Sequence, residues 1–377
     1  MSVPSNCAIV GLGLVLPETA PRTERDIRRL AVEQALADAG LERHELDGYI
    51  ATGGKTDDLR YLGLQPRFAC AVNADGASAC YAILTAAGAI AAGQVRHVLI
   101  TYATAPRMSR NRLGSYSYGY GTLYGLFGPP AIYALHAQRH MHLYGTTVSH
   151  LGSVAVNQRR YALGRPESVG YGQPMSLEDH ANSRMIADPL RLLDCTRDTT
   201  DVAVAIVVSA ATATRTSARH TVRIAGIGFG HNIRRWQDAS VYESTGEIAS
   251  AAHTAFSQAG ITREDVDVAQ LYDAFTISVL MQIEAYGFCP VGSGGPFSAA
   301  GETGPEGAIP VNTGGGSLSG FYAQGFTPIV EAVKQLRGQG GASQVPNARI
   351  ALVSGTGGNA GVQNTSAHAT LVLEGSE

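Results

Sequence analysis

The chain has 377 residues, of which 45% are hydrophobic and 16% are charged, and its formal net charge at pH 7 is −3. This balance predicts a compact globular protein, large enough for two domains or one large α/β body, and excludes an intrinsically disordered chain. The sequence has no excess of positive charge, so it gives no indication of binding to nucleic acid or to an anionic membrane.

The N-terminal residues, MSVPSNCAIVGLGLVLPET, lack a basic lead and carry Gly and Pro within their apolar part. No run of about 18 apolar residues occurs anywhere in the sequence. The five cysteines are scattered and form no CxxC pair, which argues against a disulfide framework and against a structural zinc site. These features predict a cytoplasmic protein that is not inserted in a membrane.

The predicted elements form one unit that is used twice. An apolar strand with alternating glycines is predicted at 8–15, and a strand with the same rhythm at 222–230. Each strand is followed by a helix that ends in Ala-Gly. An acidic turn and another buried strand come next, as the two sequences ALADAGLERHELDGYIAT and AFSQAGITREDVDVAQLY show. Further helices are predicted at about 77–92, 276–287 and 327–337, and further strands at 97–103 and 348–355. The shared order predicts a duplicated α/β fold with helix-covered sheets.

A long segment rich in Tyr and His separates the two halves. Insertions of this length are usually functional, so we expect lids and binding walls or an oligomer contact. Its Tyr/Gly alternation at 116–124 fits either a pocket lining or aromatic packing. The predicted domains are an N-terminal half at 1–103 plus about 190–215, an inserted loop region at 104–189, and a C-terminal half at 216–377.

Five segments resemble motifs of the thiolase superfamily, and more closely those of its sterol-carrier-type branch. They are NADGASACYAILTAAGAIAAG (73–93), NSRMIADPLRLLDC (182–195), YDAFTISVLMQIEAYGFC (272–289), NTGGGSLSGFYAQG (312–325) and VSGTGGNAG (353–361). The resemblance covers nearly the whole chain, and both the order and the spacing of the motifs match. It implies the duplicated thiolase fold, in which five layers follow one another as αβαβα.

Each catalytic position departs from the thiolase pattern. The nucleophilic Cys position falls on Gly76, the two motif histidines on Tyr272 and Tyr322, and the terminal Cys near Ser354 or Gly355. Thiolysis needs a thiolate to accept the acyl group and a second thiol or an imidazole to move a proton. We therefore do not expect a conventional thiolase.

Cys80 is the alternative nucleophile. It lies one helical turn beyond Gly76, away from the helix N-terminus that would lower its pKa. We interpret Cys80 as a small buried packing residue. An acyltransferase or Claisen-type condensing enzyme that uses Cys80 remains an alternative function.

The lipid-transfer aldolases of steroid side-chain degradation, a subset of the superfamily, are similar in lacking the Cys and in carrying Tyr at both histidine positions. This resemblance implies an aldehyde/ketone-lyase that cleaves a β-hydroxyacyl-CoA thioester by a retro-aldol reaction, without a covalent Cys intermediate. It implies no cofactor, since coenzyme A is part of the substrate, and a homodimer that joins a small OB-fold protein in a heterotetramer. A non-catalytic scaffold that binds acyl-CoA or lipid is the other alternative.

Retro-aldol cleavage passes through a thioester enolate, so it needs oxyanion donors, a base for the β-hydroxyl and an acid for the carbanionic carbon. We assign Tyr272 and Tyr322 as the acid/base pair and leave their order open. We expect the missing Cys side chain to open room for the acyl chain at Gly76. The predicted oxyanion and substrate-binding residues are Gly76, Asn312, Gly315, Gln324 and His140.

Two further features have structural interpretations. Asp273 follows Tyr272 and is expected to support a turn. His136, His140 and His142 include an i, i+4 pair with the geometry of a metal site. Because neither an acidic third ligand nor an HExxH frame accompanies them, we expect no metal.

Overall fold

The computed structural model describes residues 7–16, 22–53, 58–106, 123–196, 200–213, 220–233, 245–358 and 365–375. Most of the Tyr/Gly alternation, at 116–122, and the last part of the terminal motif, at 359–361, lie outside the described residues. A nine-stranded mixed sheet connects the two halves of the molecule, in the order β3-β2-β4-β7-β1-β8-β11-β10-β9.

The two halves of this sheet repeat one pairing pattern. The N-terminal half holds β1 (Cys7–Val15), β2 (Gly48–Thr52), β3 (Phe68–Val72), β4 (His97–Thr104) and β7 (Val202–Ala210). The C-terminal half holds β8 (Val222–Ile233), β9 (Val268–Gln270), β10 (Ile350–Gly358) and β11 (Thr365–Gly375). The β2–β4 and β9–β10 pairs are parallel, whereas β4–β7–β1 and β10–β11–β8 are antiparallel. The predicted duplication is confirmed.

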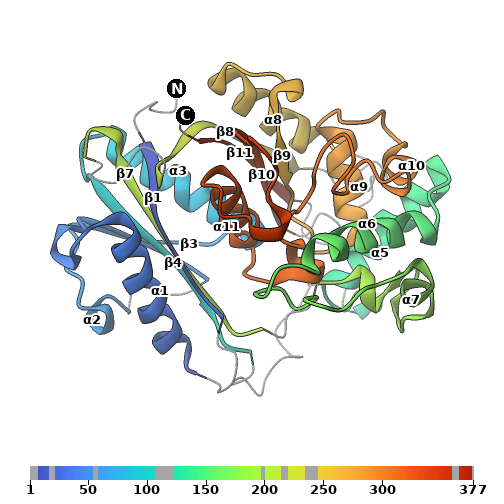
Figure 1. The fold of residues 1–377 in the computed structure, drawn as a ribbon, viewed down its shortest axis with the longest axis horizontal. Helices are drawn as coiled ribbons and strands as arrows, with labels where there is room; N and C mark the ends of the chain where they lie inside the picture. Colours follow the sequence, from blue (N-terminus) through green and yellow to red (C-terminus); the bar gives the residue numbers. More distant parts are fainter. Residues whose placement is uncertain are drawn as a thin grey trace.

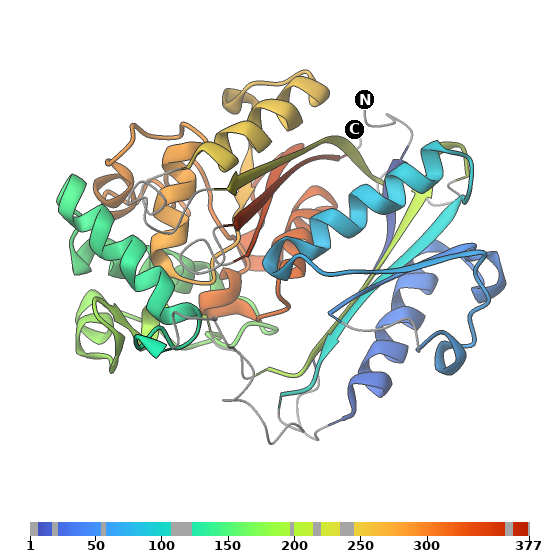
Figure 2. The same ribbon diagram turned by 180° about the vertical axis from the view of Figure 1, so that it is seen from behind.

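Helices cover the sheet in the predicted layers (Figures 1 and 2). Helix α1 (Glu24–Ala39) packs on β1, β4 and β7, and α8 (Gly246–Ala259) packs on β8 and β11. Helices α3 (Ser78–Ala91) and α11 (Phe326–Leu336) lie between the two half-sheets, and their apolar residues join both in one core cluster. The αβαβα order is confirmed.

Strand glycines let the outer helices approach the sheet. A Cβ at Gly11 would lie 2.3 Å from the carbonyl oxygen of Ala35 in α1, and a Cβ at Gly226 would lie 2.1 Å from that of Ala255 in α8. Real Cβ atoms do not approach a carbonyl oxygen so closely, so only glycine permits this packing. The same contact recurs at matched positions of the two halves.

The described part of the inserted region is helical rather than a set of loops. It contains α5 (Gly128–Tyr144), α6 (Val148–Ala162), α7 (Leu177–Asn182) and a hairpin of β5 (Met185–Ala187) and β6 (Leu190–Arg191). Helix α6 packs on α9 (Thr276–Ala285) and α10 (Gly294–Ala299), and the short α2 (Leu59–Leu62) follows β2. Within the described ranges, no helix is long and apolar enough to cross a membrane.

Candidate active site

Gly76 lies in a tight turn where any side chain would collide with its surroundings. A Cβ at this position would lie 2.2 Å from the carbonyl oxygen of Thr356 and 2.3 Å from Cζ of Tyr272. The expectation that the missing Cys side chain opens room for the acyl chain is wrong. The phenol of Tyr272 fills that space.

Two other glycine-rich segments pack closely against the same turn. A Cβ at Gly325 would lie 2.1 Å from the carbonyl oxygen of Gly76, and a Cβ at Gly357 would lie 1.9 Å from that of Ala74. The turn is therefore held between β10 and the segment that carries Tyr322. The structure thus brings together three motifs that are far apart in the sequence.

The backbone N–H groups of this turn are mostly paired within it. Ala74 N donates to Ser78 Oγ over 2.8 Å, and Ala77 N donates to the carbonyl oxygen of Ala74 over 2.9 Å. Gly76 N forms no hydrogen bond to any residue in the described part of the chain. It is therefore a backbone donor of this turn that a substrate oxyanion could use.

Tyr272 and Tyr322, the predicted acid/base pair, lie side by side. Tyr272 lies between β9 and α9 and is 6% exposed, and its phenol lies close to that of Tyr322. Burial, followed by the charges of Tyr322 and Tyr133, raises the pKa of Tyr272 well above its ordinary value of 10. Tyr272 therefore keeps its proton at neutral pH and can act as a donor.

Two further tyrosines surround this pair and were missed by sequence reasoning. Tyr133 in α5 stacks on Phe275 at a ring-centroid distance of 4.4 Å, and burial raises its pKa to about 12. Tyr102 in β4 stacks on Phe326 at 5.6 Å. Both phenols act electrostatically on Tyr272. Neither lies in a motif, so no sequence signal marks them.

A closed set of hydrogen bonds fixes the backbone of Tyr272. Its N–H donates to Ser354 Oγ over 2.8 Å, and its carbonyl oxygen accepts from Gln282 Nε2 over 2.8 Å. The Ser354 hydroxyl donates in turn to Gln282 Oε1. Ser354, at or next to the family's terminal Cys position, therefore anchors Tyr272.

Asn312 and Gly315 shape the Gly-rich turn from within. Asn312 is 1% exposed, its φ is 55°, and its Oδ1 accepts from Leu271 N over 2.7 Å. Gly315 has a φ of 89°, which glycine adopts most readily, and a Cβ there would lie 2.7 Å from Cβ of Ala162. The polar atoms of the Asn312 amide are thus used inside the protein, and an oxyanion role for either residue stays a prediction.

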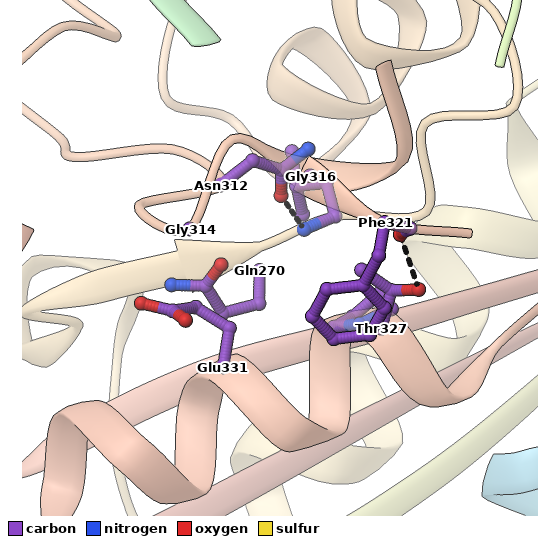
Figure 3. Close-up of a pocket in the computed structure, with 9 residues that line it drawn as sticks. Gln270, Asn312, Gly314, Gly316, Phe321, Thr327 and Glu331 are labelled. Atoms are coloured by element: carbon purple, nitrogen blue, oxygen red, sulfur yellow. Dashed lines mark hydrogen bonds between the residues drawn. The ribbon is translucent and has the colours of Figure 1, made fainter. Parts of the chain in front are cut away.

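A separate, small pocket lies beside this turn. Figure 3 shows Gln270 and Glu331 on one side of it and Phe321 and Thr327 on the other. Tyr272 and Tyr322 do not line it. Its lining residues are Gln270, Leu271, Asn312, Gly314, Gly316, Phe321, Thr327, Pro328 and Glu331.

Gln324 lies at the edge of the tyrosine cluster. A Cβ at Gly53 would lie 3.1 Å from Cε2 of Tyr102 and 4.0 Å from Oε1 of Gln324. That buried oxygen has no hydrogen-bond partner among the described residues, and the φ of Gln324 is 51°. Of the predicted binding residues, Gly76 therefore lies against the ring of Tyr272, and Gln324 lies near Tyr102.

His140 lies in a different place from the tyrosine pair. Its Nδ1 is 2.6 Å from Thr146 Oγ1, and its Nε2 is 3.2 Å from the carboxylate of Glu284. It lines a small pocket between α5 and the end of α9, which neither Tyr272 nor Tyr322 lines. Within the described ranges, no group of three or more His, Cys, Asp and Glu side chains could hold a metal ion.

Cys80 is fully buried in α3, and burial raises its pKa to about 12. The thiol is therefore protonated at neutral pH and lacks the thiolate character of a nucleophile. This environment supports the interpretation of Cys80 as a packing residue.

Comparisons with known proteins agree with this geometry. Residues 228–374 match the family model described as thiolase C-terminal domain-like. The chain is 36% identical, over 88% of its length and 91% of the relative's, to a 17-hydroxy-3-oxo-4-pregnene-20-carboxyl-CoA lyase of Mycobacterium tuberculosis. It is 33% identical, over 95% and 97% of the two chains, to a steroid side-chain-cleaving aldolase of Thermomonospora curvata.

Among solved structures, the chain is similar to one described as the Ltp2-ChsH2(DUF35) aldolase. The TM-score is 0.86 and the identity 32%, and the match covers 100% of this chain and 99% of the other. The similarity therefore extends over both halves of the sheet and the inserted region.

Proposed function

Because the chain belongs to the thiolase superfamily, in the branch of the steroid side-chain-cleaving aldolases, we propose that it cleaves the side chain of a steroid acyl-CoA by a retro-aldol reaction. It is a lyase acting on acyl-CoA and not a conventional thiolase. The observation that carries this function is the phenol of Tyr272, which fills the nucleophile's space at Gly76 and lies close to the phenol of Tyr322.

The substrate that fits this chemistry carries a hydroxyl β to the thioester carbonyl. The name of the Mycobacterium tuberculosis relative describes such a compound, a 17-hydroxy steroid with a 20-carboxyl-CoA group. The products are a ketone or aldehyde and a shortened acyl-CoA. No cofactor is needed, because coenzyme A is part of the substrate.

The two adjacent tyrosines can carry the protons that this reaction moves. Tyr322, as the phenolate, takes the proton of the β-hydroxyl while the Cα–Cβ bond breaks and its electrons form the thioester enolate. Gly76 N–H donates to the enolate oxygen, and Tyr272 delivers its proton to the α-carbon. The proton on Tyr322 then passes to the adjacent Tyr272. No net proton is consumed, and the raised pKa of Tyr272 supports its assignment as the acid.

The test compares Tyr272→Phe and Tyr322→Phe with the wild type on a β-hydroxy steroid acyl-CoA, with the partner protein present. We expect each variant to lose at least about 10²-fold in kcat, since general acid–base groups contribute factors of this size. Tyr161→Phe is the matched control, because this buried tyrosine hydroxyl has no partner among the described residues.

Two outcomes would overturn the proposal. Cleavage at the wild-type rate by both Phe variants would remove the tyrosines from the mechanism. Tight acyl-CoA binding by the wild type without any turnover would favour a non-catalytic scaffold.

We also propose that the chain acts in the cytoplasm as a homodimer that joins a small OB-fold protein in a heterotetramer. The five free cysteines support a reducing compartment. Strand β3 supports the dimer, because it is an edge of the nine-stranded sheet and has the apolar sequence FACAV. The ChsH2(DUF35) component named with the similar aldolase supports a second protein.

A further inference from the structure

The carboxylate of Asp273 is fully buried and holds the Gly-rich turn. Ser317 N lies 2.9 Å from its Oδ1 and 2.8 Å from its Oδ2, and Leu318 N donates to Oδ2 over 3.3 Å. Gln158 of α6, with its amide nitrogen turned toward the carboxylate, donates to Oδ2 over 2.8 Å. The 316–320 segment and helix α6 thus both donate to one side chain.

Glycine at position 316 is a consequence of this contact. A Cβ at Gly316 would lie 2.1 Å from Asp273 Oδ2, and the φ of Gly316 is 58°. The turn therefore curls around the Asp273 side chain, with its backbone N–H donors directed at the carboxyl oxygens, in the way that nests of N–H groups bind anions. The carboxylate of Asp273 takes the place of a bound anion.

The location of Asp273 links this contact to the catalytic pair. Asp273 directly follows Tyr272, whose backbone is fixed by Ser354 and Gln282. The turn that it holds, 316–320, leads directly into Tyr322. One side chain thus connects the rigid backbone of one phenol to the segment that carries the other.

We propose that Asp273 is a positioning residue, which sets the place of Tyr322 relative to Tyr272 and so keeps the two phenols close enough for the proton to return between them. The inference rests on the proposed retro-aldol function and deepens it. Because the Asp273 side chain is fully buried and binds backbone groups, we expect it to act on the rate of cleavage and to leave the binding of the CoA ester unchanged.

The experiment measures kcat and KM for Asp273→Asn, in the wild-type and in the Tyr322→Phe background. The amide nitrogen of Asn faces backbone N–H groups that it cannot accept from, so the turn shifts. We expect kcat to fall about 10²-fold, the cost of a misplacement of about 1 Å, with KM within twofold of the wild type. In the Tyr322→Phe background we expect little further loss, because the effect passes through Tyr322.

The matched control is Asp267→Asn. Asp267 also accepts two backbone N–H groups, from Arg349 and Ile350, each over 2.8 Å, but it lies at the far end of β10 from the tyrosines. We expect it to lower the unfolding temperature without lowering kcat. Gln158→Met, which removes one donor to Asp273, is the milder second variant if Asp273→Asn does not fold, and we expect a smaller loss of kcat with unchanged KM.

The outcomes separate this inference from the proposed function. If the wild type cleaves and Asp273→Asn retains its kcat, the positioning role is wrong while the function stands. If the losses in the two backgrounds multiply, Asp273 is a stabilising residue only. If the wild type does not cleave any β-hydroxyacyl-CoA, the proposed function itself fails.

Discussion

At the scale of single residues, Gly76 and Tyr272 share one volume. The phenol oxygen lies 2.6 Å from the place of a Cβ at Gly76, so the tyrosine and a side chain at position 76 exclude one another. Recovering a thiolase nucleophile in this chain would therefore require a change at Tyr272 as well as at Gly76. The absence of a side chain at position 76 and the presence of the Tyr272 ring are therefore coupled by steric exclusion.

Gly76→Ala adds a single methyl group and tests whether a side chain at position 76 and the Tyr272 ring exclude one another. We expect it to abolish cleavage, because the added methyl displaces the Tyr272 ring and meets the Thr356 carbonyl, and to destabilise the fold by about 1–3 kcal/mol, the usual cost of overpacking. Steady-state kinetics and urea unfolding measure the two effects.

Gly88→Ala provides the control, on the helix that follows the same turn. Nothing lies within 4 Å of a Cβ at Gly88, which is exposed in α3. We expect unchanged kcat and a gain of about 0.5–1 kcal/mol in stability, since Ala is a better helix former than Gly. Wild-type activity in Gly76→Ala would show that the ring can move aside without cost.

Sequence reasoning predicted which residues lie together more accurately than it predicted the space between them. Gly76, Tyr272 and Tyr322 were found because motifs fix positions along the chain. Motifs carry no distances, so an empty space was expected at Gly76 where the structure places a ring. Tyr102 and Tyr133 were missed for a related reason, since only the fold brings β4 and α5 to the same place.

At the scale of elements, the duplication gave reliable expectations because both copies obey the same physical rules. Asp47 accepts from the N–H groups of Arg96 and His97, and Asp267 accepts from those of Arg349 and Ile350. The matched acids thus hold the start of the matched strands β4 and β10. In the inserted region no second copy was available, and the helices α5, α6 and α7 were not predicted.

Strand β10 contributes Ser354, and its removal has a predictable effect. In Ser354→Ala the N–H of Tyr272 and Oε1 of Gln282 both lose a partner in the interior. We expect a loss of about 1–3 kcal/mol in stability, the cost of unpaired buried polar groups, together with a fall in kcat. Ser354→Thr keeps the hydroxyl, so we expect it to lose less stability and less kcat than Ser354→Ala.

Ser209→Ala distinguishes the two effects. Ser209 is a buried serine of β7 whose hydroxyl is bonded to His97, in the other half of the sheet from Tyr272. We expect a comparable loss of stability in chemical unfolding with unchanged kcat. A Ser354→Ala enzyme with wild-type kcat would mean that Tyr272 keeps its place without this anchor.

At the scale of the whole molecule, the proposed assembly depends on one end of the continuous sheet. Among the described strands, β3 pairs with β2 alone and forms an edge of the sheet, whereas β9 at the opposite edge has a bridge from Ala269 to Val311. Ala69 and Ala71 of β3 are exposed, and the strand carries no charge. Exposed, uncharged edge strands readily add a further strand, so β3 is the edge at which we expect a second copy of the chain to pair.

Ala69→Lys tests this assembly, because a charge on an edge strand opposes pairing with an identical edge. In sedimentation velocity we expect the wild type at twice the single-chain mass of 39.4 kDa and Ala69→Lys at the single-chain mass. Ala37→Lys, an equal change at an exposed position of α1 in the outer layer, should remain a dimer. A monomeric wild type, or a dimeric Ala69→Lys, would contradict pairing through β3. Because β3 runs directly into the turn of Gly76, we also expect the monomeric variant to lose cleavage activity as its edge becomes free.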